Sequence, residues 1–95
     1  MTRTERLAAE IKKAYLENKE AIDESISEKG PRGGYNCLIR PGWTHSISGT
    51  VTKACNMAGV PVGSWWSGSA PTPSSAIPTL LMERAMKAYN EIFGE

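Results

Sequence analysis

The stretch VTKACNMAGV at residues 51–60, with the PVGSWWS that follows at 61–67, decides the interpretation of this chain. Small and apolar residues recur in its first part at helical spacing, which predicts one buried helix face: Val51, Ala54, Cys55 and Ala58. Gly59 stands where a helix ends in a left-handed residue, a conformation that glycine adopts without steric cost. Pro61 cannot continue that helix but can open another. The stretch therefore predicts two helices that cross closely at a sharp turn.

The residues around this turn resemble a known DNA-binding motif. Ala-Gly-Val at 58–60 is similar to the turn of Cro/repressor-like helix-turn-helix regulators, and Trp-Ser-Gly at 66–68 resembles the end of their recognition helix. The resemblance covers residues 51–68 only. It implies an all-α fold with a central helix-turn-helix-like pair. It also implies a small non-enzymatic regulator of transcription whose second helix, at 61–67, enters the major groove of DNA.

The candidate nucleic-acid contacts fall into two sets. The second helix would present four residues to the groove: Val62, Ser64, Trp66 and Ser67. Three basic residues would contact phosphates, which position a protein on DNA without reading its sequence: Lys53, Arg40 and Arg32. The chain departs from the family pattern because the helix at 61–67 carries none of the Arg, Lys, Asn or Gln side chains that usually read bases.

The rest of the chain predicts a single domain, residues 1–95, built mainly from helices. A long amphipathic helix is expected within 1–29, running from about residue 4 and stopped by Gly30-Pro31, with Thr2 or Thr4 as its cap. Its apolar stripe is narrow and interrupted by Asn18, and two interpretations stay open: the stripe docks within its own domain, or it pairs with another copy. The segment 35–40 is suited to a short strand. A helix at 44–58 opens the helix-turn-helix-like segment 44–68, and a C-terminal helix is expected within 76–93.

Charge is distributed unevenly along the chain. The net charge is +1, but residues 31–80 contain Arg32, Arg40 and Lys53 and no acidic residue. An anion that approaches this half meets no repelling carboxylate. The same shortage leaves acid–base catalysis without its usual groups, so no enzyme and no catalytic residue is expected.

Other compositional features exclude further classes of protein. The chain has no apolar run long enough to cross a membrane. Cys37 and Cys55 are too few for a disulfide scaffold or a cysteine-only zinc site, so we expect free thiols, a cytoplasmic location and neither metal nor cofactor. DNA is the first expected partner, together with self-association through the N-terminal helix.

A second hypothesis treats the chain as a small phage-type inhibitor or binding protein. The Trp, Gly and Ser residues at 62–70 would then grip a host protein or a nucleotide-like ligand. An exposed tryptophan among small residues suits either role, since tryptophan is frequent at the energetic centre of interfaces.

Overall fold

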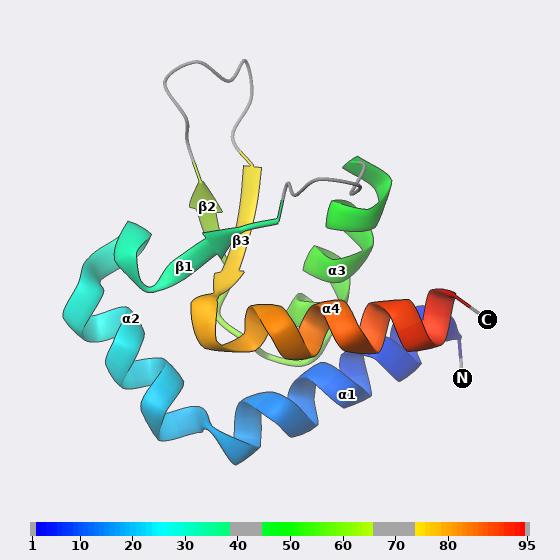
Figure 1. Ribbon diagram of the computed structural model, residues 1–95, viewed down its shortest axis with the longest axis horizontal. Coiled ribbons are helices and arrows are strands. Elements are labelled where there is room, and N and C mark those ends of the chain that lie inside the picture. Colours follow the sequence, from blue (N-terminus) through cyan, green and yellow to red (C-terminus); the bar gives the residue numbers. More distant parts are fainter. Residues whose placement is uncertain (1, 39–44, 66–73, 95) are drawn as a thin grey trace.

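The computed structural model describes residues 2–38, 45–65 and 74–94. The described residues form four helices and three strands, in this order: α1 Arg3–Glu17, α2 Lys19–Gly33, β1 Tyr35–Cys37, α3 His45–Met57, β2 Gly63–Trp65, β3 Ser74–Pro78 and α4 Thr79–Phe93. The prediction of a mainly helical fold with a short strand near residue 35 is confirmed. Figure 1 shows α1 and α4 side by side along one side of the molecule, with α3 and the strands on the other.

The core lies where α1 meets α3 and α4. The apolar stripe of α1 is buried there, with Leu7 0% and Ile11 2% exposed, and it faces Val51 of α3 and Leu81 of α4 within one cluster of buried side chains. Full burial of a leucine or isoleucine contributes about 1.5–3 kcal/mol. Of the two interpretations of the stripe, the structure shows the first, since α1 docks within its own domain.

The three strands form an antiparallel sheet in the order β1-β3-β2. The central strand β3 pairs with both neighbours at Ala76, which lies opposite Cys37 on one side and Gly63 on the other. Because β1 and β2 both run antiparallel to β3, they point the same way, and the chain leaves both strands at the same end of the sheet (Figure 1). The start of α3 is tied to this end, since the Ser48 hydroxyl donates a buried hydrogen bond of 2.9 Å to the Leu38 carbonyl.

The predicted glycine turn after α3 is confirmed in detail. Gly59 has a φ of +75°. The amide of Gly59 donates to the carbonyl of Asn56, and the amide of Val60 donates to that of Cys55, at 3.2 and 3.0 Å. These two bonds satisfy carbonyls that the end of the helix leaves unpaired. Val60 is buried and anchors the chain as it leaves the turn.

The second helix expected at 61–67 is not formed, because residues 63–65 are strand β2. Proline favours an extended conformation in the residue before it, here Val60, and valine and tryptophan favour strands over helices. Gly63 also lies under the Tyr35 ring, where an added Cβ would come within 3.3 Å of the ring. Pairing with β3 therefore replaces the recognition helix, and residues 66–68 of the motif lie outside the described residues.

The single helix expected within 1–29 is instead two helices, broken at Asn18. Thr2 caps α1 as expected, since its hydroxyl accepts from the Glu5 amide and the Glu5 carboxylate accepts from the Thr2 amide. Helix α2 passes the expected stop and ends at Gly33. The break that usually precedes a proline comes in part from a clash with the Cβ of the residue before it, and in this sequence that residue is a glycine. The C-terminal helix begins at Thr79, within the expected 76–93.

Candidate nucleic-acid interface

Helix α3 turns one polar, carboxylate-free face to solvent. Its opposite face is buried through Ser48, Val51, Ala54 and Cys55. The polar outward residues follow at steps of three and four, which places them on one side of the helix, and the exposed Met57 ends the same side. We call them the α3 polar face: Ser46, Gly49, Thr50, Lys53 and Asn56. All are exposed except Thr50, which is half-buried.

The α3 polar face differs in chemistry from the outward faces of α1 and α4. Those two helices expose mixed charges, for example Glu10, Lys12 and Lys13 on α1 and Glu83 and Lys87 on α4. The α3 polar face has a single charge, the Lys53 ammonium, among hydroxyl, amide and glycine groups. An ordinary solvated face in this protein carries carboxylates, so the composition of α3 distinguishes it from its neighbours.

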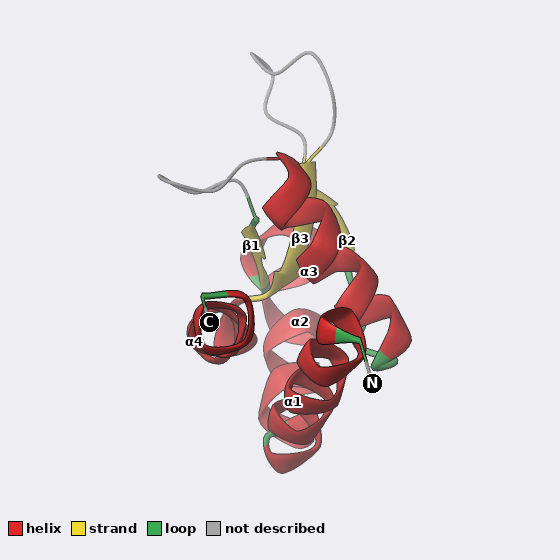
Figure 2. Ribbon diagram, turned by 90° about the vertical axis from the view of Figure 1, so that its right-hand side faces the viewer, coloured by secondary structure: helices red, strands yellow, loops and turns green. Residues whose placement is uncertain are grey.

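The carboxylates are distributed unevenly over the folded chain, as they are along its sequence. No Asp or Glu occurs between residues 31 and 82, the stretch that supplies β1, α3, β2 and β3. The carboxylates described by the structure therefore stand on α1, α2 and α4. Figure 1 and Figure 2 show the strands and the start of α3 away from α1 and α4, whereas the C-terminal end of α3 reaches α1. A polyanion would meet the least repulsion at α3 and the strands.

Two side chains of α3 have structural roles: Cys55, which lies beneath the α3 polar face, and Thr50, which belongs to it. Burial raises the pKa of the Cys55 thiol to about 12, so the thiol stays protonated near neutral pH and is no nucleophile. It is a free cysteine, as expected. The Thr50 hydroxyl donates to the Ser46 carbonyl one turn earlier, at 2.9 Å. That bond fixes the hydroxyl and leaves its oxygen able to accept a further bond.

The structure separates the residues predicted to contact DNA. Lys53 is exposed on α3, whereas Val62 is half-buried, packs against the core and lies outside any helix. Ser64 lies in the edge strand β2 and Arg32 in the last turn of α2, and only their backbones are described. Arg40, Trp66 and Ser67 lie outside the described residues.

Sequence reasoning missed the other members of the α3 polar face. Ser46, Thr50 and Asn56 lie opposite the buried stripe that was predicted for the helix at 44–58. The same spacing that predicts the buried residues therefore also predicts which residues face solvent. The resemblance to helix-turn-helix regulators directed attention to the following helix, where a reading residue would normally lie.

Among the described residues, no group of three or more His, Cys, Asp or Glu side chains lies close enough together to hold a metal ion. None of the described helices is both long enough and apolar enough to cross a membrane. No protein-family model, curated protein or solved structure matches the chain.

Proposed function

We propose that this protein is a small DNA-binding regulator that contacts the major groove through the α3 polar face. One observation carries the proposal: the outward face of α3 combines Lys, Asn, Ser and Thr with an absence of carboxylates, in the half of the fold that has none. These side chains are the ones that form hydrogen bonds with base edges. Asn pairs with adenine, Lys with guanine, and Ser or Thr with either.

The dimensions of α3 suit this role. A helix of 13 residues is about 20 Å long, and a helix fits the roughly 12 Å width of the major groove. Lys53 and Asn56 are one turn apart on the exposed side, so they reach neighbouring base pairs or a base and a phosphate. At Gly49 an added Cβ would meet no atom within 4 Å, so the helix surface is low there and the backbone can approach a groove closely.

Binding is tested with a pool of randomised duplex DNA, by selection at low salt followed by fluorescence anisotropy on the enriched sequences. We expect Lys53→Ala to weaken binding and to reduce the slope of log K against log salt by about 0.9, the value for one phosphate contact. If Asn56 reads a base, Asn56→Ala costs about 1–3 kcal/mol at one position of the site and relaxes the preference there.

Lys87→Ala is the matched control. Lys87 is exposed on α4, among the carboxylates, and its loss changes the net charge by the same amount. Equal effects of the two lysine variants would contradict the proposal, as would the absence of binding to any duplex at about 50 mM salt, where phosphate contacts are strong.

The alternative, an inhibitor that grips a host protein or a nucleotide-like ligand through residues 62–70, stays a prediction because most of that segment lies outside the described residues. A host protein that copurifies after nuclease treatment, with the complex lost in Trp66→Ala and retained in Lys53→Ala, would favour it over DNA binding.

A further inference from the structure

The junction between α1 and α2 is a one-residue elbow. Asn18 alone separates the two helices, with φ −127° and ψ 23°. Its amide donates to the Tyr15 carbonyl at 3.1 Å, instead of continuing the helical pattern to Ala14. The next helix has already begun, since the Ile22 amide donates to the Asn18 carbonyl at 2.9 Å. Asn18 is therefore the one residue between α1 and α2 that is outside both helices.

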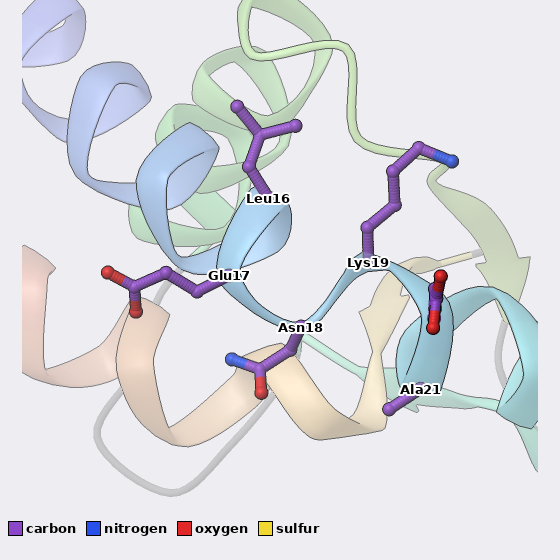
Figure 3. Close-up of a pocket in the computed structure, with 6 residues that line it drawn as sticks. Leu16, Glu17, Asn18, Lys19 and Ala21 are labelled. Carbon is purple, nitrogen blue, oxygen red and sulfur yellow. The ribbon is translucent and has the colours of Figure 1, made fainter.

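The Asn18 side chain stabilises the bent state. Its Nδ2 donates to the Ala14 carbonyl at 3.3 Å, the acceptor that the backbone amide of residue 18 would use in a continuous helix. Asparagine commonly competes with the backbone in this way. In Figure 3 the Asn18 and Leu16 side chains leave the junction on opposite sides of the ribbon. Six consecutive residues, 16–21, line the open hollow at the elbow.

A second contact braces the same bend. The Tyr15 hydroxyl donates to Asp23 at 2.8 Å across the elbow, and Lys19 pairs with the other oxygen of that carboxylate at 2.7 Å. In a straight helix residues 15 and 23 would be about 12 Å apart along the axis. Their side chains project outward from that axis, so the Tyr15–Asp23 bond exists only in the bent state.

The sequence on both sides of the elbow is that of one helix. Residues 3–29 contain no glycine or proline. In a continuous helix Asn18 would fall on the same stripe as the apolar residues Leu7, Ile11, Ile22 and Ile26. A single polar residue in such a stripe weakens the straight form without preventing it.

A straight α1–α2 helix cannot keep both halves in one core. Leu7 and Ile11 fill the space between α3 and α4 in the bent state, and swinging α1 outward would expose them and leave that space empty. Only a side-chain set of the same shape can refill it, and a second copy of the chain supplies one.

We propose that Asn18 is the hinge of an exchange in which α1, as part of a continuous α1–α2 helix, packs into the core of a second copy of this chain. The proposal is independent of DNA binding. Because the apolar stripe of α1 is buried in the monomer, two copies would associate by exchanging α1 and not by contact between the surfaces of their α1 helices.

The first test is Asn18→Leu, which removes the bond to Ala14 and completes the apolar stripe. We expect its dimer dissociation constant, measured by sedimentation equilibrium, to fall at least about tenfold relative to the original chain. Asn90→Leu is the matched control, since Asn90 is an exposed asparagine on α4. If the Asn18→Leu variant folds and stays monomeric over the same concentration range as the Asn90→Leu variant, the proposal is overturned.

The second test distinguishes exchange from surface contact. Glu17 of α1 and Arg84 of α4 form an ion pair at 3.2 Å. Chains in which Cys37 and Cys55 are replaced by serine and Glu17 by cysteine are mixed with chains that carry the same two serines and Arg84→Cys. The mixture is unfolded and refolded at high concentration with Asn18 intact. Exchange places the two new thiols together, so oxidation yields a covalent dimer. The yield of this dimer falls when the same pair of chains is refolded in dilute solution. Dimers without this cross-link would overturn the proposal, even if Asn18→Leu failed to fold.

Discussion

Replacing Ser48 by alanine should destabilise the fold through a single buried hydrogen bond. Ser48 is 7% exposed, and its hydroxyl donates at 2.9 Å to the carbonyl of Leu38, which is fully buried. Alanine removes the donor that the described residues provide to that carbonyl, at a cost of about 1–3 kcal/mol. The higher helix propensity of alanine returns roughly 0.5 kcal/mol. We therefore expect a net loss of about 0.5–2.5 kcal/mol.

This loss is measurable because small domains have only about 5–15 kcal/mol of stability. For a chain of this size each kcal/mol corresponds to roughly 4–8 °C in Tm. Thermal and urea unfolding followed by circular dichroism would show a lower Tm and a lower midpoint at unchanged m. Ser46→Ala, the same change on the exposed side of α3, should stay within about 0.5 kcal/mol of the original chain. Equal stability of the two variants would refute the role of the buried bond.

Three further predictions concern stability and reactivity. Gly49→Ala should stabilise the fold by about 0.5–1 kcal/mol because the added Cβ meets no atom within 4 Å. Gly34→Ala should destabilise it because the added Cβ would lie 2.6 Å from the backbone of α2. Urea midpoints of the two variants that move in the same direction would contradict this. The pKa of Asp23 is held below its ordinary value, first by the hydrogen bond from Lys19, so its stabilisation is present above the unfolded pKa of 3.8 and is lost as pH falls through the lower folded pKa. As the pH falls below about 4, the original chain should therefore lose more stability than Asp23→Asn, and parallel pH profiles would exclude the effect. Cys55, with its pKa raised to about 12, should react with a thiol reagent far more slowly in the folded chain than in urea, measured with the other cysteine changed to serine.

The helices and turns that depend on local chemistry could be predicted from the sequence. The end of α3 followed from Gly59, since a left-handed residue and its two hydrogen bonds involve neighbours along the chain. The buried face of α3 followed from its spacing, and α4 from the apolar residues after Pro78. In each case the residues that decide the structure lie within a few positions of the element.

The two mispredicted segments depend on contacts that periodicity does not contain. Strand β2 forms because β3, which begins nine residues later, pairs with it, and because Gly63 fits under the Tyr35 ring. The break at Asn18 is specified by a side chain that replaces a backbone amide as donor to one carbonyl. For the candidate site, Lys53 was identified from sequence, but its neighbours on the α3 polar face were not. The turn at 58–60 suggested that the following segment, and not α3 itself, would face a partner.

The order β1-β3-β2 also constrains how the chain folds during synthesis. The central strand is the last of the three to leave the ribosome, so neither outer strand has a hydrogen-bonding partner until Ser74–Pro78 has emerged. Until then α3 can pack against α1, which precedes it in the chain, but not against the sheet. Formation of the sheet therefore waits on contacts between distant parts of the sequence, which slows folding relative to a bundle of helices alone. During that interval the unpaired edges of β1 and β2 are the part of the nascent chain most exposed to wrong pairing.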